Sequence, residues 1–347
     1  MYKKITAIMM AMLLLFSLLT GCGKTASNPV ESSSGQKPAE TASAPEADPK
    51  ADISKMEISI ATAFAEGDPG VDMMKIFAEK VAEKSGNKIK MNVFSGGTLG
   101  GERDIMESLS TGAIEMATVS IITAPAFFAT DYNILCTPFL VSDIAECRKI
   151  LAGPLGDKLR SIYEETGFVS LNTYMDRGLR MLSTNVKVEK PEDVVNLKLR
   201  LPENQVYMAV WGEYGATPIP IALTEIYTSL QTGVVQAQEN PYATIYANKF
   251  YEVQKYIVKT QHVIDLYETH ASKQWWDKLN DAEKAVLKEA LAEACEIGNE
   301  LTKKSEEELE DVFVKAGVEI IMPDREAFKA AAQPAVDKLV KSYFAKD

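Results

Sequence analysis

The sequence predicts an α/β protein with one long helix near its C-terminus. Strand and helix patterns alternate from Met56 to Val119, which is typical of a parallel sheet covered by helices. Apolar residues recur at helical spacing from Asn280 to Phe313, over about 30 positions, a length that one small lobe does not need. A chain of 347 residues is also long for one compact core, so one large or two medium domains are expected.

The predicted first lobe begins with three strands, at residues 56–61, 89–93 and 116–119. Two helices lie between these strands and end at Gly86 and Gly112, because glycine suits the left-handed turn after a helix. The glycine-rich turn at residues 96–101 contains neither a P-loop nor a dinucleotide-binding pattern. We therefore interpret it as a tight turn rather than a phosphate site.

Helix and strand patterns continue through the middle of the chain. Helices are predicted at residues 144–151, 155–166, 205–214 and 223–231, and a further strand at residues 168–174. We expect the chain to enter the second lobe at residues 176–178 and to return near residues 262–266. The predicted first lobe is residues 56–177 plus 266–305, and the predicted second lobe is residues 178–265 plus 306–347.

The long helix has the clearest boundaries in the sequence. Asn280 suits the N-cap position, and Glu283 three residues later completes the pattern of a capping box. Gly317 suits the C-terminal end. A helix of about 30 residues is roughly 50 Å long, so we expect it to extend beyond one lobe.

Residues 1–22 have the pattern of a signal peptide, with Lys3 and Lys4 before an apolar segment. The end of that segment, Leu19-Thr20-Gly21-Cys22, resembles a bacterial lipobox, in which the cysteine is lipidated. A plain secretory signal with an incidental cysteine is the alternative. Residues 23–55 are rich in Ser, Ala, Pro, Glu and Lys, and we predict a disordered tether there.

Composition argues against several classes of function. The net charge of −12 disfavours nucleic acid or an anionic membrane surface as a partner. The remaining cysteines and the two histidines match no zinc or redox spacing; they are Cys136, Cys147, Cys295, His262 and His270. We expect these side chains to pack or hydrogen-bond in the interior, with no metal, no cofactor and no enzyme activity.

Two arginines and an asparagine are candidates for an anion site. Arg200 lies in an alternating Lys-Leu-Arg-Leu run that Pro202 stops, so it is near the end of a strand, where open α/β sheets bind ligands. Arg180 and Asn240 also lie near predicted element ends. Two guanidinium groups and an amide suit the two oxygens of a carboxylate. Ordinary surface ion pairs are the alternative.

Several short motifs occur in one order along the chain. They are Gly96-Gly97-Thr98-Leu99-Gly100-Gly101-Glu102-Arg103, Gly178-Leu179-Arg180, Lys198-Leu199-Arg200-Leu201-Pro202, Leu230-Gln231-Thr232-Gly233 and Gln238-Glu239-Asn240-Pro241. Together they resemble the DctP-type solute-binding proteins of tripartite ATP-independent periplasmic (TRAP) transporters, over about residues 56 to 322. The resemblance implies a two-lobed fold like that of periplasmic binding proteins (type II, TRAP class), with the long helix as a spine across both lobes.

The resemblance also implies which residues bind the ligand. Arg200 matches the family's main carboxylate-binding arginine, Arg180 its second arginine, and Asn240 an asparagine that supports the ligand. Weaker candidates are Arg177, Leu223, Glu66 and Ser120.

Three positions depart from the family pattern. Leu223 replaces an aromatic residue that often lines the pocket, Asn196 replaces a glycine, and Val235-Gln236-Ala237 replaces Val-Asp-Gly. The first departure concerns which ligand fits, and the other two concern local turn geometry.

The function that the resemblance implies is ligand capture outside the cytoplasm. A small organic acid, such as a C4-dicarboxylate or a sugar acid, would bind between the lobes, and the membrane subunits of a TRAP permease would detect lobe closure. A lipid on Cys22 would anchor the protein to the membrane. Three alternatives remain at this stage: the binding component of an ABC-type importer, a ligand-sensing partner of a membrane receptor, and an enzyme acting on acidic sugars.

Overall fold

The computed structural model describes residues 52–130, 133, 136–141 and 143–344. The predicted signal peptide, Cys22 and most of the predicted tether lie outside the described residues. The described chain belongs to one compact unit, which contains two β-sheets. In this part of the chain, no helix combines the length and the apolar composition that crossing a membrane requires.

The first sheet has five strands in the order β2-β1-β3-β10-β4. Its strands are β1 (Met56–Ala61), β2 (Ile89–Phe94), β3 (Met116–Ser120), β4 (Phe168–Leu179) and β10 (Ile264–Ser272). The first three strands are parallel, as their alternation with helices predicts, whereas β10 runs antiparallel to both β3 and β4. The sheet is therefore mixed rather than parallel throughout, because β10 is formed by chain that returns from the second sheet.

Helices cover the first sheet and complete what we call the first lobe. They are α2 (Pro69–Lys84), α3 (Glu102–Ser110), α4 (Thr123–Phe128), α5 (Ile144–Leu151), α6 (Pro154–Glu165) and α10 (Lys273–Trp276). Asp68 begins α2 as its N-cap, since its side chain accepts a hydrogen bond from the Gly70 amide at 3.0 Å. Gly86 and Gly112 have positive φ angles after α2 and α3, which confirms the predicted helix ends.

The second sheet has six strands in the order β11-β9-β5-β8-β6-β7. Its strands are β5 (Met181–Thr184), β6 (Lys198–Leu201), β7 (Thr217–Pro220), β8 (Ala237–Asn240), β9 (Tyr256–Val258) and β11 (Glu319–Ile321). Its helices are α7 (Gln205–Glu213), α8 (Ile226–Gln231), α9 (Tyr242–Ala247) and α12 (Arg325–Phe344), with 3₁₀ turns η2 (Pro191–Val194), η3 (Leu223–Glu225) and η4 (Phe250–Glu252). This sheet with its helices is called the second lobe.

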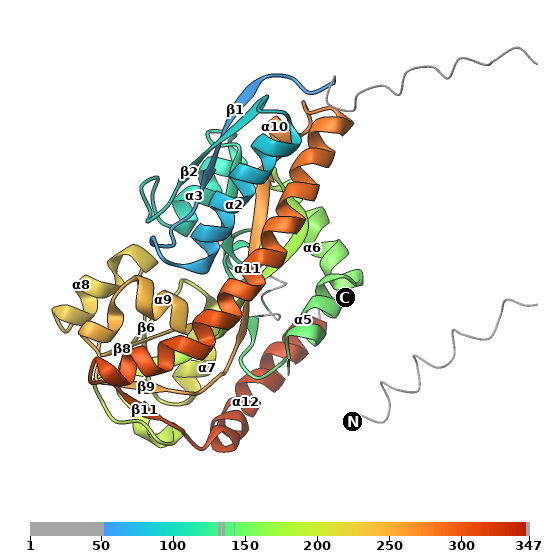
Figure 1. The fold of residues 1–347 in the computed structure, drawn as a ribbon. Helices are drawn as coiled ribbons and strands as arrows, with labels where there is room; N and C mark the ends of the chain where they lie inside the picture. Colours follow the sequence, from blue (N-terminus) through green and yellow to red (C-terminus); the bar gives the residue numbers. More distant parts are fainter. Residues whose placement is uncertain (1–51, 131–132, 134–135, 142, 345–347) are drawn as a thin grey trace, which may run out of the picture. The chain divides into compact units, whose positions relative to one another are not determined.

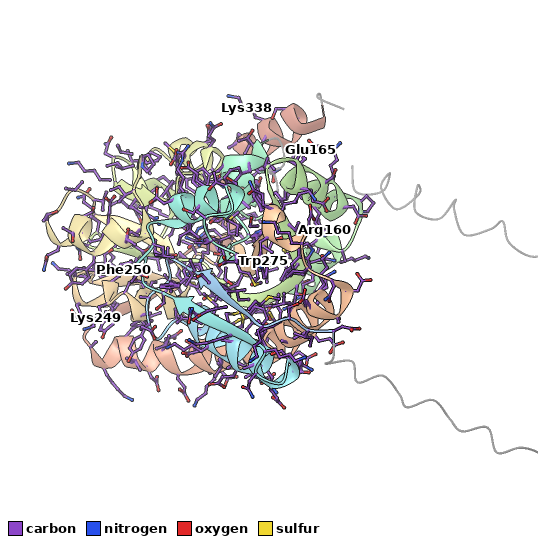
Figure 2. The ribbon with its side chains drawn as sticks, turned by 90° about the horizontal axis from the view of Figure 1, so that it is seen from above. Arg160, Glu165, Lys249, Phe250, Trp275 and Lys338 are labelled. Carbon is purple, nitrogen blue, oxygen red and sulfur yellow. The ribbon has the colours of Figure 1, made fainter. Side chains whose placement is uncertain are left out.

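The chain passes between the two sheets twice at strand ends. β4 of the first sheet ends at Leu179 and β5 of the second begins at Met181, so Arg180 alone separates them. The return lies between β9 and β10, at residues 259–263. The side-chain view places Lys249 and Phe250 of the second lobe far from Arg160 and Glu165 of the first (Figure 2).

The third connection is α11 (Asp281–Lys315), a helix of 35 residues. Asn280 and Glu283 form the predicted capping box, and Gly317 follows the helix with a φ of 92°. The helix contacts α2 and β4 of the first lobe and α9 and β11 of the second (Figure 1). The expected reach across both lobes is therefore confirmed.

Candidate ligand-binding site

A cavity of about 450 Å³ lies between the two lobes. Its first-lobe lining comes from the start of α3 and from the segment after β3, and its second-lobe lining from the segments after β6 and β7. The lining residues are Gly101, Glu102, Arg103, Asp104, Ile122, Thr123, Ala126, Phe127, Arg200, Pro202, Glu203, Asn204, Pro220, Ile221, Ala222 and Leu223. Carboxyl ends of neighbouring parallel strands thus meet at the cavity, the usual ligand position in open α/β sheets. A small organic molecule fits a space of this size.

Arg200 is a positively charged residue of the cavity lining. It lies on β6 and is only 3% exposed, yet no carboxylate of the described residues pairs with it. The one side-chain hydrogen bond of Arg200 to the described residues goes from Nε to the Ile221 carbonyl oxygen, at 2.7 Å. Burial lowers the pKa of Arg200 to about 9, against the opposing effect of Glu239. The charge therefore lacks a close counter-ion, which a bound carboxylate would supply.

Arg180 has the opposite environment. Its Nε and one Nη atom bind the two carboxylate oxygens of Glu239 at 2.5 and 2.8 Å, and its other Nη atom binds Asp265 at 2.6 Å. The side chain of Asn240 accepts a further hydrogen bond from Arg180 at 3.1 Å. Neither Arg180 nor Asn240 lines the cavity. Arg180 is therefore neutralised by two carboxylates of the protein itself, those of Glu239 and Asp265.

Arg177 and Ser120 belong to the same buried network. Arg177 forms an ion pair with Asp265 and donates to the Thr244 hydroxyl at 2.9 Å. The Ser120 hydroxyl donates to the other oxygen of Asp265 at 2.6 Å. Arg177 and Arg180 are close enough to Arg200 for their charges to disfavour its charged form. The network therefore borders the site electrostatically, although neither residue lines the cavity.

The other two weaker candidates lie in different surroundings. Leu223 begins η3 and lines the cavity as a buried side chain. Glu66 is exposed, forms an ion pair with Lys75 and accepts a hydrogen bond from Ser95 at 2.6 Å. It is not among the cavity residues.

Glu102 is a cavity residue that the sequence interpretation did not single out. It opens α3, and its Oε1 accepts hydrogen bonds from the Ser120 amide at 3.2 Å and the Thr123 hydroxyl at 2.9 Å. Its charge favours the charged form of Arg200. The available signal was a glutamate directly after the glycine-rich turn, which we interpreted only as a turn. The site thus contains a fixed carboxylate as well as a cation.

The second cation of the cavity, Arg103, is already paired. It donates to Glu107 at 3.1 Å and to Glu203 of the second lobe at 2.8 Å, and it lies 4.9 Å from the ring centre of Phe127. The pair with Glu203 joins the two lobes at the cavity. Of the two arginines lining this cavity, Arg200 is therefore the one without a carboxylate partner.

Glu239 stabilises the network beside the site in a pH-dependent manner. Burial alone would raise its pKa, but Arg180 and His262 outweigh burial and bring the pKa down from 4.5 to about 2. Stabilisation from this carboxylate is therefore present above about pH 4.5 and is lost as the pH falls toward about 2. His262 bridges Glu239 at 3.1 Å and Thr260 at 2.8 Å, an interior role that the sequence interpretation anticipated.

Asn196, which replaces a glycine of the family pattern, keeps the turn before β6 intact. Its φ is 61°, a left-handed conformation that asparagine tolerates better than most residues. The backbone amide of Asn196 donates to the Gly215 carbonyl oxygen at 2.8 Å. The turn before β6, the strand that carries Arg200, therefore forms without a glycine at this position. The three described cysteines Cys136, Cys147 and Cys295 are buried, as predicted, and none of them forms a disulfide.

The two arginines are expected to differ in their effect on stability. Arg180→Met leaves Glu239 and Asp265 buried with fewer partners, so we expect a loss of about 3–5 kcal/mol of unfolding free energy. Arg200→Met removes an uncompensated buried cation, so this free energy should stay the same or rise. Chemical denaturation of the two variants without ligand measures the difference. Equal losses in both variants would contradict the distinction between a paired and an unpaired arginine.

Comparison with known proteins identifies the family. The family model described as bacterial extracellular solute-binding protein, family 7 (DctP) matches residues 60–343. The C4-dicarboxylate-binding periplasmic protein DctP of Rhodobacter capsulatus is 28% identical over 268 residues, which are 76% of this chain and 80% of that protein.

Solved structures show the same fold. The sugar acid binding protein DctPAm from Advenella mimigardefordensis, in complex with galactonate, has a TM-score of 0.79 at 30% identity, over 85% of this chain and 94% of that one. A TRAP periplasmic solute-binding protein from Pseudomonas putida F1 with bound D-glucuronate has a TM-score of 0.78 at 28% identity, over 83% and 94% of the two chains. The resemblance drawn from the motifs is confirmed, and the chain belongs to the DctP family of bacterial extracellular solute-binding proteins.

Proposed function

We propose that this protein captures a small organic acid outside the cytoplasm and delivers it to the membrane subunits of a TRAP permease. The observation that carries the proposal is Arg200, a buried guanidinium with no carboxylate partner that faces a cavity between two lobes. A ligand carboxylate would provide the counter-charge and two hydrogen-bond acceptors in a planar arrangement. Binding and release without chemical turnover suffice for this role.

The charges of the cavity favour a hydroxylated monocarboxylate over a dicarboxylate. Arg200 can neutralise one carboxylate, whereas Arg103 already has Glu107 and Glu203 as partners. A second ligand carboxylate would meet the fixed negative charge of Glu102. Hydroxyl groups can instead donate to Glu102, so a sugar acid suits the site. Galactonate and D-glucuronate, bound by the two structural relatives, have this combination of groups.

We propose a supporting role for the network of Arg180, Asn240, Arg177 and Ser120. Asn240 ends β8, which pairs with the Arg200 strand through Gln238. The side-chain amide of Asn240 donates to the side-chain oxygen of Gln238 at 2.6 Å. The network therefore holds β8, the strand next to the one that carries Arg200. Ligand that contacts both lobes stabilises the closed arrangement by the difference in its affinity for the closed and open forms. Direct contact of Arg180 or Asn240 with ligand would require them to exchange some of their internal partners.

Arg200 should dominate the affinity for the ligand. We expect Arg200→Met to weaken binding by more than about 100-fold, since a buried ligand carboxylate would lose its counter-ion, a cost of roughly 3 kcal/mol. Calorimetric titration with galactonate, D-glucuronate, erythronate and succinate measures this loss. Arg325→Met is the control, because Arg325 is exposed and lies outside the cavity lining. Unchanged affinity in the Arg200 variant would refute the assigned role.

Glu102 should determine the preference between acids. We expect Glu102→Gln to weaken galactonate binding by about tenfold, because a charged acceptor for ligand hydroxyls becomes neutral. The same change should strengthen binding of succinate, whose second carboxylate no longer meets a negative charge. Competition binding of the two acids to both proteins checks the ratio of affinities. A parallel change in affinity for both acids would contradict this role for Glu102.

We further infer that Cys22 carries a lipid that anchors the protein to the outer face of a cell membrane. The lipobox-like Leu19-Thr20-Gly21-Cys22 supports this inference, and Cys22 lies outside the described residues. Expressed in its bacterial host, the protein should partition into the detergent phase, whereas Cys22→Ser should partition into the aqueous phase. Aqueous partition of the unaltered protein would show a plain secretory signal instead.

A further inference from the structure

The long helix α11 forms hydrogen bonds with β4, the strand by which the chain leaves the first lobe. Asn299 and Thr302, three residues apart on one face of the helix, both bind the backbone of Asp176 on β4. The Asp176 amide donates to the Asn299 side chain at 2.8 Å, and the Thr302 hydroxyl donates to the Asp176 carbonyl at 2.8 Å. Glu306 lies one turn further along the same face and reaches Gly178. This contact lies two residues before Arg180, where the chain changes sheets.

Glu306 is a carboxyl group without a partner in this contact. Its Oε1 is shielded from solvent and has no hydrogen bond with any described residue. Gly178 has a φ of 102°, and a Cβ atom added there would overlap the Glu306 carboxyl group. Glycine is therefore required twice at this position, by its backbone conformation and by the approach of the helix side chain. Burial raises the pKa of Glu306 from 4.5 to about 7, and Lys259 only partly opposes this effect.

The charged groups around Glu306 are already engaged with one another. On the second-lobe side, Lys259 binds Glu310 at 2.7 Å, and the Tyr242 hydroxyl also donates to Glu310, at 3.1 Å. On β4, Asp176 pairs with Arg148 at 2.6 Å. On β10, Asp265 lies opposite Gly178 in the strand register and pairs with Arg177 and Arg180. An ionised Glu306 would thus have to take Lys259 from Glu310 or move toward water.

We propose that Glu306 forms a proton-dependent contact between the long helix α11 and β4. Protonation of Glu306 would then bias the arrangement of the two lobes. The neutral acid fits against Gly178 and keeps α11 on β4. The ionised form is driven out of the contact by the cost of an unpaired buried charge. Stabilisation from the contact is complete below about pH 4.5 and is lost as the pH rises through about 7.

The first test compares stability across pH in the full-length protein without ligand. Glu306→Gln keeps the size of the side chain and removes the ionisation, while Glu307→Gln makes the same charge change at an exposed position on the same helix. As the pH is raised from about 5 to about 8, the melting temperature of Glu306→Gln should increase by several degrees relative to that of the unaltered protein at the same pH. Glu307→Gln should follow the unaltered protein. The same pH response in all three proteins would overturn the proposal.

The second test measures the arrangement of the lobes directly. Spin labels at Lys90→Cys in the first lobe and Lys187→Cys in the second, both exposed positions, report the distance between the lobes. The distance distribution should change with pH when Glu306 is present and stay constant in Glu306→Gln. A distribution that shifts equally in both proteins would contradict a role for Glu306.

A third measurement does not depend on any variant folding. Carbon-13 NMR of glutamate-labelled full-length protein gives the titration midpoint of Glu306 itself. A midpoint near 7 supports the proposal, and one near 4.5, the value of an ordinary glutamate, would overturn it. Because all three tests use ligand-free protein, their failure would leave the proposed ligand site unaffected, and failure of the ligand site would leave this proposal standing.

Discussion

The proposed function depends on one uncompensated charge, the guanidinium of Arg200. Burying an ion without a partner is costly, and proteins avoid it unless something else supplies the counter-charge. The chain has carboxylates in abundance, with 49 Asp and Glu residues against 37 Lys and Arg, yet none of those described pairs with Arg200. Arg180, by contrast, is a buried arginine whose charge is neutralised by Glu239 and Asp265. The proposed function assigns the missing counter-charge of Arg200 to the carboxylate of the ligand.

The region around the site also connects the two lobes. β4 runs into β5 through Arg180 alone, so the residue that leaves the first sheet is the same residue that ties β8 and β10 together through ion pairs. The long helix holds β4 two to four residues earlier, through Asn299, Thr302 and Glu306. Any rotation of one lobe against the other must act on these contacts. The helix contacts and the ion pairs of Arg180 therefore meet on one short segment of chain, residues 176–180.

Local patterns predicted much of this arrangement. Met56–Ala61 alternates as a strand does, and the Asn280 capping box begins a helix whose period is unbroken, so both elements agree with the prediction. Other features depend on contacts distant in sequence. Glu239 pairs with an arginine 59 residues away, so the internal role of Arg180 has no local signature. The helix α12 contains Pro334, which disfavours a helix interior and hides its pattern. Glu102 could not be distinguished from an ordinary helix-start residue before its distance from the cavity was known.

The most direct test of the account is the crystal structure of this protein with a bound acid, using galactonate as the first ligand. The account predicts both carboxylate oxygens within hydrogen-bond distance of the Arg200 guanidinium, with a ligand hydroxyl donating to Glu102. A carboxylate bound elsewhere in the cavity, with Arg200 still bonded only to the Ile221 carbonyl, would contradict it.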